Sequence, residues 1–259
     1  MKRGVGILAL AVGLGGCRAP AEAPGQLESL AAFLFAHARD EDPAALVAGA
    51  ENLSLWLDDH LAETLEGYTI NNLGEDDIAG LDERDRSLDG LLGAAVASAS
   101  GHRVRDFIDP LVWGDPMEQE PGAYESFDKD FGAGRRCFPD CDYLRAEIAA
   151  VANYPLGLVV NSEYTAEYRW LELEAGPALM HRTYLKGPAE VSLEWLAVDA
   201  QFFVSIVLPT KRGARRLQAT WIAARMGEKA APEDMALQLV IDSMRDQQQR
   251  MDDWVTEHP

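Results

Sequence analysis

Ser98, Ser100 and His102 place two hydroxyl groups and an imidazole in one short stretch, which is where hydrolytic chemistry would first be sought. A nucleophile elbow needs a serine between two glycines on a sharp turn. Gly101 follows Ser100, but neither serine has the preceding glycine. Small residues at the end of a helix are therefore the simpler interpretation of this stretch.

The histidines could bind a metal only if several of them lay at ligand spacing. They form no close pair at the spacing of zinc ligands on a helix: His37, His60, His102, His181 and His258. His181 lies in the middle of an apolar segment, where a histidine is more often a hydrogen-bonded wall residue than a base. We predict no catalytic residues, no metal site and no cofactor, and hence a protein that is not an enzyme.

The acidic segment from Asp128 to Gly132 begins like a calcium-binding loop, with carboxylates at alternating positions. The twelfth position of such a loop holds a glutamate that binds the ion through both oxygens. Here that position is Pro139, so a solvated acidic loop is favoured. An irregular calcium site that recruits Asp140 or Asp142 stays open. No glycine-rich phosphate-binding turn follows any predicted strand, so nucleotide binding is not indicated.

The start of the chain has the parts of a secretory signal. Lys2 and Arg3 are followed by an apolar run from Val5 to Leu14, and small residues precede Cys17. The apolar run is well short of the roughly 20 residues that a membrane-spanning helix needs. The ending Leu14-Gly15-Gly16-Cys17 resembles the lipobox of bacterial lipoproteins.

The lipoprotein resemblance implies that residues 1–16 are a signal peptide that is removed, and that Cys17 carries the lipid. In that family the cysteine is diacylated and the new amino terminus is acylated, with fatty acids such as palmitate. Three acyl chains exceed the two signals that stable anchoring needs. The mature chain would then be held in the bacterial cell envelope, outside the cytoplasm. An ordinary signal peptide with an incidental cysteine is the alternative.

Arg18 bears on the destination within the envelope. In the lipoprotein family an aspartate at this position commonly retains the protein in the inner membrane. The resemblance therefore favours delivery to the outer membrane, with the folded part on a short tether in the periplasm or at the cell surface.

With Cys17 assigned to the lipid, Cys137 and Cys141 are left as the one disulfide pair of the chain. An oxidising envelope would keep this small ring closed. Loop-closure entropy gives it a stabilisation on the order of 2 kcal/mol. A redox motif would have two intervening residues, and a zinc site would need further ligands nearby. A structural disulfide is therefore the favoured interpretation.

The formal net charge of −20 limits the partners of the chain. A surface this acidic repels phosphate backbones, so nucleic acid is a poor partner. It also disfavours broad contact with anionic lipid headgroups. We therefore expect membrane attachment to come from the acyl chains on Cys17, and the charge identifies no protein partner.

The N-terminal part predicts a tether followed by helices. Residues 17–26 form the tether, and residues 27–100 form a helical section. Apolar residues at steps of three and four predict a first helix from Leu27. A second helix begins after Asp42-Pro43 and ends at Glu66-Gly67. A third, glycine-interrupted helix is predicted over about residues 75–98.

Residues 101–145 predict a long loop that contains the disulfide. Prolines, glycines and acids with scattered aromatics run from Gly101 to about Arg136 without periodicity. Long irregular connections of this kind are usually functional or mobile. A short helix from about Asp142 to Val151 is expected to follow.

Residues 146–259 predict an antiparallel sheet closed by a helix. About five segments joined by short turns are predicted as strands: 164–170, 178–185, 190–197, 202–208 and 216–223. Apolar and polar residues alternate in 190–197 and 216–223, and 202–208 has an inward apolar row with further apolar residues on its other face. A long helix from Pro232 to about Val255 has one apolar face, which would cover the sheet. The predicted fold class is α+β, with an N-terminal helical section, an antiparallel β-meander and a long C-terminal helix.

A meander closed by one long C-terminal helix resembles the helix-grip fold of START-like and Bet v 1-like proteins. The resemblance covers about residues 151–254 and lies in the order of the elements. It implies a hydrophobic ligand held between the curved sheet and the helix. The simplest family plan opens with a strand and two short helices, and the predicted N-terminal helices and long loop depart from it.

Four residues are the candidate ligand-binding positions under this resemblance. Trp195 and Trp221 lie on the alternating apolar faces of two predicted strands, and Met244 and Met251 lie on the inner face of the terminal helix. They would line an adaptable cavity or pack as ordinary core. The predicted function is accordingly an envelope lipoprotein that binds an apolar small molecule or lipid. A non-enzymatic accessory protein of an envelope complex is the alternative.

Overall fold

The structure is a computed structural model that describes residues 22–81, 88–132, 137–154, 157–227, 229–230 and 232–258. The predicted signal peptide and Cys17 lie outside these ranges. Among these described residues, no helix is both long and apolar enough to cross a membrane.

Two helices open the described chain, as the sequence predicts. They are α1 (Leu27–His37) and α2 (Ala44–Leu65), and they pack against each other through buried leucines. α2 begins where the Asp42 carboxylate accepts a hydrogen bond from the Ala44 N–H at 3.0 Å. This bond satisfies one of the free N–H groups of the first turn.

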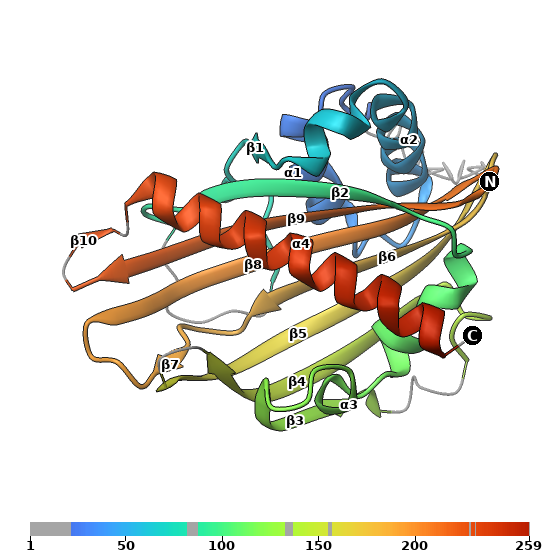
Figure 1. Ribbon diagram of the computed structural model, residues 1–259. Coiled ribbons are helices and arrows are strands. Elements are labelled where there is room, and N and C mark those ends of the chain that lie inside the picture. The colour runs from blue at the N-terminus through green and yellow to red at the C-terminus, as the bar shows by residue number, and fades with distance from the viewer. Residues whose placement is uncertain are drawn as a thin grey trace, which may run out of the picture.

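One antiparallel sheet forms the middle of the molecule (Figure 1). Its strands lie side by side in this order: β1 (Tyr68–Ile70), β2 (Leu92–Ser100), β9 (Gly213–Met226), β8 (Leu196–Thr210), β6 (Gly176–Leu185), β5 (Leu158–Leu173), β4 (Tyr143–Tyr154) and β3 (Tyr124–Asp130). The short strands β7 (Glu190–Val191) and β10 (Lys229–Ala230) pair with β5 and β9.

The predicted third helix over about residues 75–98 is wrong: among its described residues, 75–80 form turns and Leu92–Ser100 forms strand β2. This strand pairs with β9 from Leu92 opposite Ile222 to Ser100 opposite Ala214. A strand buried on both faces has no polar alternation to reveal it, and its small residues suit a helix equally well. Gly93 marks the close packing, because a Cβ there would lie 2.7 Å from the Trp221 ring.

The predicted long loop and the helix after it are also wrong. The loop contains three short helices, η1 (Val104–Phe107), η2 (Asp109–Trp113) and α3 (Pro116–Gln119), and then strand β3. The predicted helix over 142–151 is strand β4, which is paired with β5 along its whole length. Its alanine-rich sequence fits a helix locally, but pairing between distant segments makes it a strand.

One of the five predicted meander strands is much shorter than expected. Of the segment 190–197, only Glu190 and Val191 form a strand, and a turn follows before β8 begins at Leu196. Trp195 lies in that turn and is 52% exposed. The alternation in this segment therefore does not reflect a buried strand face.

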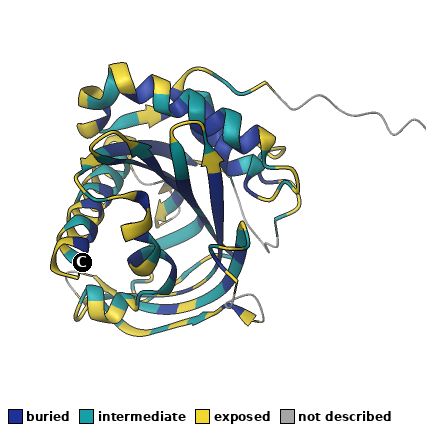
Figure 2. Ribbon diagram, turned by 90° about the vertical axis from the view of Figure 1, so that its right-hand side faces the viewer, coloured by how far each residue is buried: buried dark blue, intermediate teal, exposed yellow. Residues whose placement is uncertain are grey.

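The sheet lies between two sets of helices. α1 and α2 pack on its outer face, and α4 (Glu233–Glu257) lies with the short helices on its inner, concave face. Seen from the end, the sheet curves around the short helices, with α1 and α2 above it (Figure 2). From β2 through the short helices and strands to α4, the order of elements is the helix-grip plan. The N-terminal helices are an addition to it.

Candidate functional site

The four predicted ligand-binding residues do not lie together. Trp195 is in the exposed turn before β8, and Trp221 lies on the outer face of the sheet. The Trp221 ring is fully buried against Phe35 of α1, with ring centroids 5.7 Å apart. Its indole N–H donates to the Asn71 carbonyl at 2.8 Å. Trp221 is therefore part of the core between the sheet and α1, not of a site under α4.

Met244 and Met251 do face the sheet from α4, as predicted. Met244 packs against Ala94 and Val96 of β2. Met251 belongs to a different cluster, together with Phe107 of η1. Both methionines are buried, so each is a packed core residue at its own end of the helix.

The packing of side chains on the concave face differs between the two ends of the strands. Next to the short helices it is filled by the second core cluster, which includes Phe107, Tyr168 and Leu179. Farther along the strands its side chains are only half-buried, because α4 packs mainly against β2. We call this second part the half-open face; it consists of Ile148, Tyr164, Thr183, Gln201, Phe203 and Ile222.

A row of polar side chains crosses the concave face beside the half-open face. Strand pairing places His181 of β6 opposite Ser205 of β8, and Ser205 opposite Gln218 of β9. The Gln218 amide donates to Gln247 of α4 at 3.1 Å, so the row faces α4. No local sequence pattern predicts this row. The only available signal was polar residues at inward positions of apolar strands.

Two atoms of this row are buried without a hydrogen-bond partner. They are Nε2 of His181 and Oε1 of Gln218. Within the described residues, the other two such side-chain atoms belong to Glu28 and Tyr184, which lie on the side of α1. A buried polar atom without a partner is uncommon and calls for a bound water or ligand group. The expectation of a hydrogen-bonded His181 is therefore wrong at Nε2.

The surroundings keep His181 uncharged. Its ring stacks on Tyr168 with centroids 4.6 Å apart and planes 4° from parallel, and Phe203 meets it edge-on. Burial, together with the smaller effect of the charge of Lys129, lowers the pKa of His181 to about 3. The imidazole is thus neutral at pH 7, with one nitrogen able to donate and the other able to accept a hydrogen bond.

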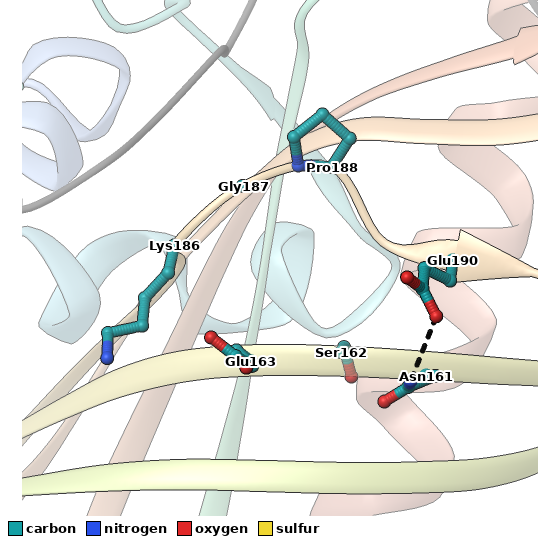
Figure 3. Close-up of a pocket in the computed structure, with 7 residues that line it drawn as sticks. All are labelled: Asn161, Ser162, Glu163, Lys186, Gly187, Pro188 and Glu190. Atoms are coloured by element: carbon teal, nitrogen blue, oxygen red, sulfur yellow. Dashed lines mark hydrogen bonds between the residues drawn. The ribbon is translucent and has the colours of Figure 1, made fainter.

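A separate hollow of about 250 Å³ lies where β5 meets the loop after β6 (Figure 3). Its lining is mostly polar: Asn161, Ser162, Glu163, Lys186, Gly187, Pro188 and Glu190. The Asn161 amide donates to Glu190 at 3.0 Å, and Lys186 forms an ion pair with Glu147 at 2.6 Å. None of the four predicted ligand residues lines it, and its polarity does not suit an apolar ligand.

Ser100 and His102 are close together but are not arranged for nucleophilic catalysis. The Ser100 hydroxyl donates to the Asp252 carboxylate, and the His102 backbone N–H donates to the Ser100 oxygen at 3.1 Å. The His102 ring instead contacts the Thr256 hydroxyl at 2.9 Å. The imidazole therefore does not activate the serine.

The acidic segment that resembles a calcium loop lies mostly in strand β3, and the two cysteines after it are bonded to each other. Asp128 and Asp130 lie in β3, and the Asp130 carboxylate accepts a bond from the Gly132 N–H at 2.7 Å. No group of three or more metal-ligating side chains lies together among the described residues. Cys137 and Cys141 form a disulfide, as predicted.

No protein family model and no curated protein sequence matches the chain. Solved structures similar to it include a STAR-related lipid transfer protein from Xanthomonas axonopodis, with 11% identity, coverage of 73% of this chain and 92% of that chain, and a TM-score of 0.43. Human STARD10 has 10% identity, coverage of 79% and 80%, and a TM-score of 0.42. Norcoclaurine synthase from Thalictrum flavum has 11% identity, coverage of 65% and 87%, and a TM-score of 0.36. The fold by itself leaves open whether this chain is an enzyme.

Proposed function

We propose that this chain is a membrane-anchored binding module of the bacterial envelope, which holds an apolar molecule carrying one uncharged polar group. The carrying observation is the pair of buried, unpartnered atoms, Nε2 of His181 and Oε1 of Gln218, in one row of the concave face. Leaving such atoms unpaired costs about 1–3 kcal/mol each. A hydroxyl or amide of a bound molecule would provide the missing partner.

The half-open face supports an apolar body for this molecule. Tyr164, Phe203 and Ile222 present aromatic and aliphatic surface that α4 leaves half-buried. Polar contacts here are few; one is the Tyr164 hydroxyl 3.5 Å from Gln201. A cationic ligand is disfavoured, because its charge would lose its hydration beside a neutral His181 and would be repelled by the nearby charge of Lys129.

A competition experiment tests the binding proposal. The full chain is loaded with the uncharged fluorescent probe N-phenyl-1-naphthylamine, and the probe is displaced with 1-dodecanol or with dodecane. We expect dodecanol to displace the probe at about tenfold lower concentration than dodecane, because its hydroxyl can hydrogen-bond to the unpartnered atoms of His181 and Gln218. The preference should disappear in His181→Phe/Gln218→Leu, which keeps the apolar body of the site.

Two further variants localise the probe. Thr183→Trp adds bulk on the half-open face and should abolish probe binding, with the far-ultraviolet circular dichroism unchanged. Leu55→Trp adds comparable bulk on the outside of α2, where Leu55 is 66% exposed, and should leave binding unchanged. If Thr183→Trp binds the probe as well as the parent, the concave face is not the site.

The anchoring part of the proposal is supported by the lipobox alone. Cys17→Ser should either release the mature chain from the membrane fraction or leave its signal uncleaved. A cleaved variant that still sediments with membranes would show that the lipid on Cys17 is not the anchor. Comparing inner and outer membrane fractions of the parent tests the expected outer-membrane destination.

An accessory role in an envelope complex is the second candidate, and exposed apolar side chains favour it. Trp195 and Met226 lie at one end of β8 and β9, and Met235 and Leu239 lie in the first turns of α4. If no uncharged probe binds the concave face and Trp195→Ser/Leu239→Ser disrupts an envelope complex, this second function replaces the first.

A further inference from the structure

A second hollow, of about 580 Å³, lies at the end of the sheet where β2 ends and β8 turns into β9. Its lining is basic: Gly101, Arg103, Val104, Arg105, Pro177, Pro209, Thr210, Lys211, Arg212 and Gly213. We call it the basic hollow. None of the described residues that line it is acidic, although the chain as a whole carries a net charge of −20.

The four cations of the basic hollow are free to bind an anion. All four are exposed, and none of them forms an ion pair with a described residue: Arg103, Arg105, Lys211 and Arg212. The Arg105 guanidinium lies over the Trp170 ring, 5.6 Å from its centroid, which restrains it at the hollow. The neighbouring acid Asp106 accepts from the Arg103 backbone N–H at 2.7 Å.

Close backbone packing brings these distant segments together. The turn between β8 and β9 carries Lys211 and Arg212. Gly213, the residue after this turn, packs against Ser100, the last residue of β2. A Cβ on Gly213 would lie 2.1 Å from the Ser100 carbonyl oxygen, so only glycine allows this approach. The cluster is therefore a product of the fold, held by a position that admits no side chain.

The basic hollow lies at the end of the molecule from which the tether leaves. The Asn52 amide of α2 donates to the carbonyls of Ala23 and Pro24, both at 3.0 Å. The adjacent Glu51 accepts from the Glu174 N–H at 3.4 Å, in the turn that leads to Pro177 of the hollow. Figure 1 shows α2 over this end of the strands. A stretched tether from Cys17 to Ala23 would span only about 20 Å.

We propose that the basic hollow binds the phosphate of anionic phospholipid headgroups in the membrane that holds the anchor. Guanidinium groups bind phosphate through paired hydrogen bonds, and three of the four cations are arginines. The remaining acidic surface is repelled by an anionic membrane, so the basic end turns toward the bilayer. This inference rests on the anchoring part of the proposed function and is independent of the ligand on the concave face.

Calorimetric titration of the full chain in a neutral detergent tests the proposal. The probes are dihexanoyl phosphatidylglycerol, dihexanoyl phosphatidylcholine and glycerol 1-phosphate. The variant is Lys211→Gln/Arg212→Gln. Its control is Arg225→Gln/Lys229→Gln, which removes the same charge from the other end of β9 and from β10; because Arg225 forms an ion pair with Asp199, the fold of this control is checked by circular dichroism.

We expect saturable binding of phosphatidylglycerol, weaker binding of glycerol phosphate and no binding of phosphatidylcholine. A hydrogen bond between a cation and a phosphate contributes about tenfold or more in binding, so the Lys211/Arg212 variant should bind at least about tenfold more weakly. The control variant should bind like the parent. Probe binding on the concave face should be unchanged in both, which separates this proposal from the ligand proposal.

Three results would overturn the inference. Glycerol phosphate that binds as tightly as phosphatidylglycerol would make the hollow a site for a free phosphorylated molecule. An equal loss in the control variant would mean non-specific charge attraction. Absence of saturable phosphatidylglycerol binding, in a chain that fractionates with membranes through Cys17, would reject the headgroup site and leave the anchor standing.

Discussion

Thr220 and Trp221 are neighbours in β9, yet they serve opposite faces of the sheet. The Thr220 hydroxyl donates to the sulfur of Met244 in α4 at 3.4 Å, whereas Trp221 packs under α1 and donates to the Asn71 carbonyl. Side chains alternate between faces along a strand, so this register assigns each residue to one layer. The concave face therefore carries the polar side chains of Thr220 and Gln218, whereas Trp221 belongs to the layer under α1.

This assignment predicts different roles for the two tryptophans. Trp221→Ala should lower the free energy of unfolding by about 3–5 kcal/mol, because it empties a fully buried site. Trp195→Ala should change it by less than about 0.5 kcal/mol, since that side chain is exposed. Urea denaturation measures both. Equal losses would contradict the placement of Trp221 in the core.

The neutral His181 predicts a pH dependence of stability. Its folded pKa of about 3 lies below the unfolded value of about 6.5, so between these values the unfolded state binds the extra proton. Stability should therefore fall as pH decreases, by about 1.4 kcal/mol per pH unit from this group. The measurement is the difference in unfolding free energy between the parent and His181→Phe from pH 6.5 to 4. A difference that does not change with pH would contradict a buried, neutral imidazole.

A buried ion pair between Glu167 and Arg182 connects the outer face of the sheet to α1. Glu167 accepts from Arg182 Nε at 2.6 Å, and Arg182 also donates to the Phe35 carbonyl of α1 at 2.7 Å. Removing one partner leaves an uncompensated buried charge, so Glu167→Leu should cost about 3–5 kcal/mol. The double variant Glu167→Leu/Arg182→Met should be less destabilised than this single variant. A larger loss in the double variant would show that Arg182 still stabilises the fold without Glu167, through its contacts with Phe35.

The disulfide predicts a local effect. Thiol labelling of the denatured, unreduced chain should find neither Cys137 nor Cys141 free. Cys137→Ser/Cys141→Ser should cost on the order of 2 kcal/mol. Its hydrogen exchange should rise around Phe138, which lies within the ring and packs against Tyr168. Exchange that rises equally in β8 and β9 would show that the ring supports the whole sheet.

Local sequence signals were enough for the helices at both ends of the chain and for the long strands of the meander. The apolar stripes of α1, α2 and α4 repeat within each helix, and Asp42 and Pro232 mark the starts of two of them. In β9 apolar and polar residues alternate, β8 contains a long apolar run, and short turns fix the neighbours of both strands. These features need no information from distant parts of the chain.

The remaining elements depend on contacts that no local pattern contains. β2 and β4 are rich in alanine and glycine, and their pairing with β9 and β5 decides that they are strands. The polar row from His181 to Gln218 and the basic hollow at Arg103 and Lys211 join residues from separate strands and turns. Periodicity shows that a face is apolar, but only the register and curvature of the sheet decide which side chains meet there.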